Sequence, residues 1–161
     1  MYNKKYQLLN VLATIFVAFV VLLAILNFFS EPNRKSIFGY RGYTVISGSM
    51  VPALQIGDYV ILKEEPFQQL KEEDIITFKN DRIIVTHRVV HLTSKNQLIT
   101  RGDANAVDDL LEVTDQEYIG KVQWRIPFLG YFMILMQNPL FFSVSLALIA
   151  IRFVFLWIIK I

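Results

Sequence analysis

The chain has 161 residues, of which 54% are hydrophobic, and its formal net charge is only +2. This length accommodates one compact domain together with membrane segments. Because the basic residues are scattered along the chain, the composition gives no support for nucleic-acid binding. The lack of cysteine excludes disulfides, thiolate catalysis and cysteine-ligated zinc, and it does not identify the cellular compartment.

The first element is an uncharged apolar segment of 22 residues, Leu8 to Phe29. A helix of about 20 residues crosses a bilayer. A cleaved secretory signal is the alternative, but its apolar core has only about 7–15 residues and ends in a small-x-small site. The residues from Asn27 to Ser30 offer no such site. We therefore predict that residues 1–30 hold a short N-terminal tail and a retained transmembrane anchor.

The charges around this segment do not orient it. Lys4 and Lys5 precede the segment, and Arg34, Lys35 and Arg41 follow it. The positive-inside rule compares lysine and arginine on the two sides of a helix, so it gives no decisive direction here.

From Tyr40 to about Val122 the pattern changes to short runs rich in β-branched and aromatic residues, separated by charged or turn-forming pieces. We expect strands at Thr44–Ile46, Asp58–Lys63, Asp74–Phe78, Ile83–Leu92, Gln97–Arg101 and Tyr118–Trp124. The expected fold class is mostly β, with a small antiparallel β domain over residues 31–125 and a transmembrane helix at each end of the chain.

The C-terminal end is apolar again but is interrupted. Residues 126–151 carry no charge, Pro139 lies inside this run, and Arg152 follows it. A central arginine costs about 2.5–3.5 kcal/mol on insertion scales, which long apolar flanks offset. We predict a second transmembrane helix over residues 139–161, with residues 126–138 lying against the membrane surface. A re-entrant segment is the alternative.

The first candidate catalytic residues are in Ser47-Gly48-Ser49. These small residues let the backbone turn after the run Thr44–Ile46. Pro52 follows, and a regular strand does not continue through it. A serine fixed on a turn after a strand can serve as a nucleophile if a base lies within reach. His87 is the best base in the chain, since a neutral imidazole accepts a proton near pH 7. His91 lies roughly 13 Å away along an extended strand, so both histidines cannot serve one serine.

Four motifs follow one another between about Tyr43 and Gly130: Ser47-Gly48-Ser49-Met50 with Pro52, Gly57-Asp58, His87-Arg88-Val89, and Gly102-Asp103 with Asp109. In this order they resemble the type I signal peptidases. The resemblance is to the branch in which histidine replaces the lysine base, found in the endoplasmic reticulum, in archaea and in some Gram-positive bacteria. No lysine of this chain falls on a motif position, and a lysine base would need burial to lower its pKa.

The resemblance implies roles for the motif residues. Ser49 would be the nucleophile, His87 the base, and Asp109, six residues after Asp103, the group that orients the imidazole. Asp103 would order the loop or assist the histidine. The Ser49 N–H and the Ser47 hydroxyl would stabilise the oxyanion.

Two positions depart from the family pattern, and neither belongs to the triad. Arg101 stands where lysine is common, and Ala104 stands where the first of two asparagines is common. Asp108 is expected only to cap the loop, and Gly57-Asp58 to form a structural turn.

The implied function is a membrane-bound serine endopeptidase that cleaves signal peptides after small residues at positions −3 and −1. No metal, nucleotide or organic cofactor is implied. The partners implied are preproteins, the lipid bilayer and other membrane subunits, and no nucleic acid. The protein would lie in the cell membrane or endoplasmic reticulum, with its N-terminus cytoplasmic and its catalytic domain on the outer or luminal face. Two alternatives remain: a regulatory or self-cleaving protease of the same fold, and a non-enzymatic membrane-tethered β module that binds peptides.

Overall fold

The structure is a computed structural model that describes residues 4–29, 36, 38–81 and 83–160. The chain divides into two compact units, one formed by residues 29–131 and the other by residues 1–28 with 132–161. Arg34 and Lys35, two of the basic residues that follow the first apolar segment, lie outside the described residues, as does Ile161 at the end of the predicted second span.

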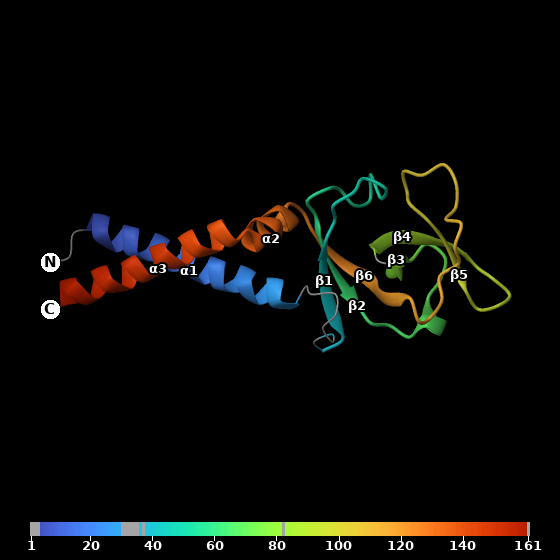
Figure 1. Ribbon diagram of the computed structural model, residues 1–161, viewed down its shortest axis with the longest axis horizontal. Coiled ribbons are helices and arrows are strands. Elements are labelled where there is room, and N and C mark those ends of the chain that lie inside the picture. The colour runs from blue at the N-terminus through green and yellow to red at the C-terminus, as the bar shows by residue number, and fades with distance from the viewer. Residues whose placement is uncertain (1–3, 30–35, 37, 82, 161) are drawn as a thin grey trace. The chain divides into compact units, whose positions relative to one another are not determined.

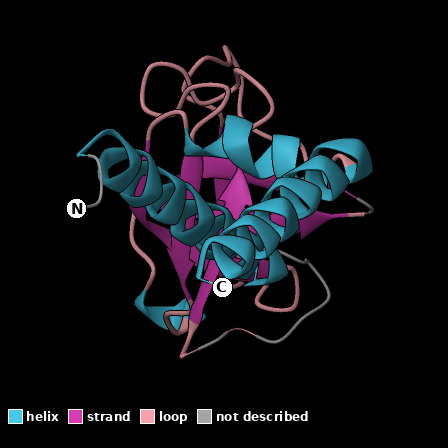
Figure 2. Cartoon of the chain, turned by 90° about the vertical axis from the view of Figure 1, so that its left-hand side faces the viewer, coloured by secondary structure: helices cyan, strands magenta, loops and turns pink. Residues whose placement is uncertain are grey.

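The unit of residues 29–131 is built on one six-stranded sheet, shown by the arrows in Figure 1 and in magenta in Figure 2. Its strands are β1 (Tyr40–Thr44), β2 (Tyr59–Lys63), β3 (Ile75–Asn80), β4 (Ile83–Leu92), β5 (Leu98–Arg101) and β6 (Tyr118–Ile126). The order across the sheet is β1-β2-β6-β3-β4-β5, and every neighbouring pair is antiparallel. The predicted mostly-β, antiparallel architecture is confirmed, and a single 3-10 turn, η1 (Phe67–Gln69), is the only helical piece between β1 and β6 among the described residues.

Side chains on the two faces of the sheet build two apolar clusters, because successive residues of a strand point to opposite faces. On β3, Ile76 and Phe78 belong to one cluster and Ile75 packs against the other. The first cluster consists of Phe67, Leu70, Ile76, Phe78, Val89, Leu98 and Val113, and the second of Met50, Leu54, Val60 and Leu62. The second cluster therefore reaches directly under the Ser49 turn, through the neighbouring Met50.

Five strands lie within one or two residues of the predicted positions, but the first prediction, Thr44–Ile46, is wrong. β1 occupies Tyr40–Thr44 instead, and it contains Gly42, a residue that is unfavourable inside strands. Gly42 is accommodated because the Tyr59 ring of β2 fills the space that a side chain at position 42 would need. β1 ends at Thr44, although Val45 still bonds to the backbone of Gly57 and Asp58, and Ile46 is 76% exposed.

The second unit contains α1 (Lys4–Phe29) and α3 (Pro139–Lys160), and α2 (Leu129–Gln137) connects the sheet to α3. Asn138 caps α3, since its side-chain oxygen accepts the backbone N–H groups of Leu140 and Phe141. Pro139 then occupies the first helical position, where its missing N–H costs nothing. α3 thus begins at Pro139, the residue at which the sequence predicts the start of the C-terminal helix.

Polar side chains join α1 and α3, which lie side by side in Figure 1. The Arg152 guanidinium donates from Nη2 to the Thr14 hydroxyl at 2.6 Å. Among the residues whose side chains are described, no single helix has the length and apolar character of a membrane span. The two helices Leu129–Gln137 and Pro139–Val154 together have the length and apolar composition of a span, and a bend of 85° separates them.

Candidate active site

The Ser49 turn is fixed on both sides by the sheet unit. Before it, Val45 exchanges backbone hydrogen bonds with Asp58 O and Gly57 N, each 2.9 Å long. After it, Met50 is buried in the second apolar cluster, and the Leu54 N–H donates to the Met50 carbonyl at 2.8 Å. Ser49 therefore stands on a short turn between an extended segment and a buried side chain.

His87 lies on β4 and bridges Ser49 and Asp109. Its Nε2 is 3.2 Å from the Ser49 Oγ, and its Nδ1 is 2.6 Å from the Asp109 Oδ2. The imidazole is only 8% exposed, and its ring meets the Phe78 ring edge to face at 6.4 Å. With the proton on Nδ1 donated to the carboxylate, Nε2 is free to accept the serine proton. The structure thus brings together the three residues predicted for the triad.

Asp109 has a second support that sequence reasoning missed. The Thr100 hydroxyl donates to the Asp109 Oδ2 at 2.7 Å, and the Asp109 N–H donates to the Thr100 carbonyl at 2.8 Å. Thr100 is fully buried at the end of β5. Because both the carboxylate and the backbone of Asp109 are tied to one buried residue, the carboxylate is directed at His87. The one sequence signal was a hydroxyl residue on the inward face of a predicted strand.

Asp103 contacts Arg88, and His87 is not among its partners in the described structure. The Arg88 Nε and Nη2 reach the Asp103 Oδ1 and Oδ2 at 2.8 and 2.7 Å, while Nη1 donates to the Glu73 carbonyl at 2.9 Å. The hydrogen bonds that Arg88 donates to the Asp103 carboxylate raise the pKa of the guanidinium above its ordinary value. Of the two predicted options for Asp103, ordering of the loop is the one that this geometry favours.

The loop after β5 also holds the backbone of Ser49. The Ala104 N–H donates to the Ser49 carbonyl at 2.8 Å. A side chain on Gly102 would lie 2.6 Å from that same carbonyl oxygen, so only glycine permits this approach. The replacement of asparagine by alanine at position 104 is compatible with the contact, because the backbone makes it.

In the described structure, His87 has no hydrogen bond to Asp108, His91 or Asp58. Asp108 pairs with Arg101 at 3.2 Å on an exposed part of the loop. His91 is exposed, and β4 changes register between Val89 and His91. Asp58 is buried, accepts the Gln55 N–H at 2.7 Å and pairs with the Arg125 Nε at 2.6 Å, which fits the structural turn expected for it.

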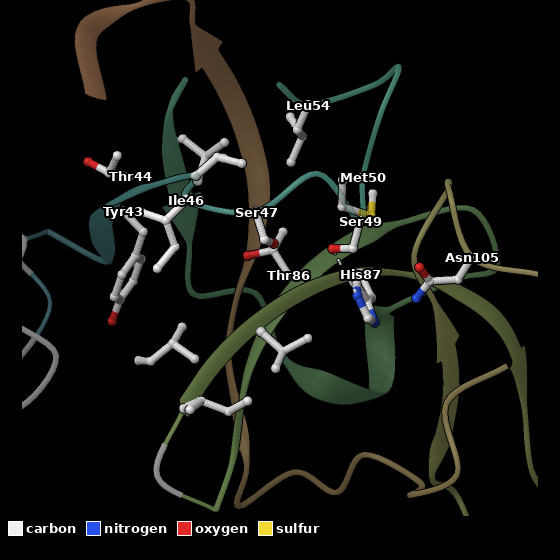
Figure 3. A pocket seen from close by; sticks show the side chains of 15 residues that line it. Tyr43, Thr44, Ile46, Ser47, Ser49, Met50, Leu54, Thr86, His87 and Asn105 are labelled. Carbon is white, nitrogen blue, oxygen red and sulfur yellow. Dashed lines mark hydrogen bonds between the residues drawn. The ribbon is translucent and has the colours of Figure 1, made fainter. Parts of the chain in front are cut away.

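Two groups beside Ser49 are available as hydrogen-bond donors. No described residue accepts a hydrogen bond from the Ser49 backbone N–H or from the Ser47 hydroxyl. Figure 3 shows Ser47, Ser49 and His87 together at the centre of the cleft. Both donors were expected to face an oxyanion, and neither is used to hold the fold.

A cleft of about 420 Å³ runs from this centre between two extended segments, Tyr43–Ser47 and Ile83–His87. Both segments have unpaired backbone edges over the described residues: β1 pairs only with β2, and β4 pairs with β5 only from Arg88 onward. The cleft wall also includes Met50, Leu54 and Val60 from the second cluster, and Asn105. An extended peptide can therefore bond to two strand edges at once. Within the described residues, no group of three or more histidine and acidic side chains is suited to hold a metal ion.

Comparison with known proteins identifies the family. The family model "Signal peptidase, peptidase S26" matches residues 8–119, which include all four motifs. The chain belongs to the signal peptidase family, peptidase S26. The predicted resemblance is confirmed by this match.

Curated relatives of this S26 peptidase come from yeasts and from a bacterium. The Signal peptidase complex catalytic subunit SEC11 of Candida albicans (strain WO-1) is 40% identical over 112 residues, which cover 62% of this chain and 67% of the relative. SEC11 of Candida tropicalis is 39% identical over the same shares. Signal peptidase I W of Bacillus subtilis is 35% identical over 108 residues, covering 63% of this chain and 57% of the relative.

Proposed function

We propose that the chain is a membrane-bound serine endopeptidase that removes signal peptides from exported preproteins. The observation that carries this proposal is the hydrogen-bonded series Ser49–His87–Asp109 in a member of the S26 family. Ser49 is the nucleophile, His87 the general base, and Asp109 orients the imidazole and stabilises its charged form.

In the first half-reaction, His87 Nε2 takes the proton from the Ser49 Oγ as this oxygen attacks the scissile carbonyl carbon. The carbonyl oxygen becomes an oxyanion, which accepts hydrogen bonds from the Ser49 N–H and the Ser47 hydroxyl. When the C–N bond breaks, His87 gives its proton to the leaving amine of the mature protein. The signal peptide remains bound to Ser49 as an ester.

In the second half-reaction a water molecule replaces the leaving amine. His87 takes one proton from the water, whose oxygen attacks the ester carbonyl, and the proton then passes to the Ser49 Oγ as the ester bond breaks. The signal peptide leaves with a free carboxylate. Each step needs His87 to face Ser49 on one side and Asp109 on the other, as the contacts at 3.2 and 2.6 Å allow.

The substrate binds as an extended strand in the cleft, with its backbone paired to the free edges beside Tyr43–Ser47 and Ile83–His87. Alternate side chains of an extended peptide point the same way, so positions −1 and −3 face the same wall. Apolar side chains such as Ile46 and Ile84 line this cleft. We infer that its wall admits only small residues at −1 and −3.

The apolar segments Leu8 to Phe29 and 139–161 anchor the enzyme in the cell membrane or the endoplasmic reticulum membrane, with the sheet unit on the outer or luminal face. The SEC11 relatives are named as catalytic subunits of a complex, which supports further membrane subunits as partners of this chain.

The test is cleavage of a panel of preproteins by the full chain in detergent, followed by sequencing of the new N-termini. Cleavage after small residues at −3 and −1 is expected. The matched control is a preprotein in which leucine replaces the residue at −1, and it should stay intact. If the chain cleaves only itself, or binds the preproteins without cutting them, one of the two alternative functions holds instead.

A further inference from the structure

On one side of His87 the cleft has an apolar arm, whose lining includes Tyr43 and Ile46. Asn105 lines the cleft on the other side of His87. In Figure 3 the side chains of Tyr43 and Ile46 lie on one side of the Ser49–His87 contact and Asn105 lies on the other, with its amide directed toward the ring. Asn105 is the one lining residue of this cleft contributed by the loop after β5.

The position of Asn105 is fixed by its neighbours. Its backbone N–H donates to the Gly102 carbonyl at 2.8 Å, and the next residue back, Ala104, donates to the Ser49 carbonyl. The amide Nδ2 lies over Gly102, 2.8 Å from where a Cβ of that residue would be. Asn105 is therefore held close to the backbone of Ser49.

The amide of Asn105 is nevertheless unused by the fold. Its side chain is exposed, and no described residue bonds to its oxygen or nitrogen. An asparagine amide offers one acceptor and a donor in the same plane, which matches the C=O and N–H of an extended peptide. A free amide of this kind, at a fixed place in a cleft, is suited to bind a backbone.

The chemistry at His87 decides which backbone this is. The imidazole must hand its proton to the leaving amine, so the first residue of the mature protein lies on the His87 side of the cleaved bond. The apolar arm on the other side, with Tyr43 and Ile46, is then left for the signal-peptide residues −3 to −1. We propose that Asn105 is a substrate-binding residue that holds the backbone of the first residues after the cleaved bond. This inference rests on the proposed function.

The test compares two substrates that form the same ester with Ser49. One is a presequence peptide that continues into the mature sequence, and the other is an ester in which a small alcohol replaces the mature part. Asn105→Ala should lower kcat/KM for the peptide substrate about tenfold, as expected for a lost hydrogen bond. For the ester substrate, kcat/KM should stay within about twofold of wild type. Val107→Ala, an exposed change on the same loop outside the cleft, should alter neither.

The outcomes are distinguishable. Equal losses on both substrates would mean that Asn105 supports the triad rather than the leaving peptide, and unchanged cleavage of the peptide would mean that it does not bind substrate. Either result overturns the inference while the proposed function stands. Failure of the wild type on both substrates would overturn the proposed function and this inference with it.

Discussion

Arg88, the residue after His87 on β4, forms an ion pair with Asp103 through two hydrogen bonds. The Arg88 Nε and Nη2 lie 2.8 and 2.7 Å from the two carboxylate oxygens of Asp103. The pair joins the strand that carries the base to the loop that carries Asp109. The same loop binds the Ser49 carbonyl through the Ala104 N–H. One short segment after β5 thus contacts the surroundings of all three proposed catalytic residues.

We predict that Ser49→Ala and His87→Ala each reduce preprotein cleavage by at least about a thousandfold, because each removes a group that reacts. Both variants should keep the folded domain, as judged by resistance to added protease. His91→Ala is the matched control, since this histidine is exposed and lies outside the cleft, and it should keep most of the activity. Loss of the folded domain in the Ser49 or His87 variants would indicate a structural role instead.

Thr100→Val should lower kcat about tenfold or more with little change in KM. The substitution keeps the shape of the side chain but removes the hydroxyl that donates to Asp109 at 2.7 Å, a hydrogen bond to a charged group. Thr100→Ser retains the hydroxyl and should restore most of kcat. Rates measured at saturating preprotein, together with urea unfolding, check this. If the serine variant is as slow as the valine variant, Thr100 acts through packing.

The ion pair of Arg88 and Asp103 can be tested with a double-mutant cycle. Arg88→Ala and Asp103→Ala should each slow cleavage, and the double variant should be little worse than the slower single one, since the two residues act as one unit. Their coupling in urea unfolding should be about 1–3 kcal/mol, below that of a fully buried pair because Arg88 is partly exposed. The exposed pair Arg101–Asp108 is the control, and its coupling should be below about 1 kcal/mol.

The pH dependence of this pair follows from the raised pKa of Arg88. A raised pKa means that the guanidinium contributes stability that is fully present below its ordinary pKa and is lost only as the pH rises above it. The coupling should therefore be constant from neutral to moderately alkaline pH. Additive losses in the cycle would show that Asp103 acts without Arg88.

The sequence was sufficient to predict the strands whose apolar residues alternate and to pick out the residues of the four motifs. It did not locate β1, because the reason why Gly42 is tolerated in a strand lies on Tyr59 of the neighbouring strand. It also left the partner of Asp103 open, since the choice between Arg88 and His87 depends on how the loop crosses the end of β4. Thr100 was missed for the same reason: a hydroxyl on a strand shows no partner until the loop after it has folded back.

The last prediction separates a histidine base from a lysine base. His87→Lys should be nearly inactive at pH 7, because a lysine works as a base only where burial lowers the pKa of its ammonium by several units. In the wild type, the Asp109 carboxylate lies 2.6 Å from the imidazole. This carboxylate would hold a lysine at position 87 in its charged form. Activity should recover in part at high pH, or when Asp109→Asn is added.

The measurement is preprotein cleavage by the wild type, His87→Lys, and His87→Lys combined with Asp109→Asn, from about pH 6 to pH 10. The single variant should gain activity only toward the alkaline end, and the double variant should gain it at lower pH, because the nearby negative charge is gone. Asp109→Asn alone, on the wild-type histidine, is the control for damage caused by the asparagine. Activity of His87→Lys close to wild type at neutral pH would contradict the assignment of Ser49, His87 and Asp109 as a triad.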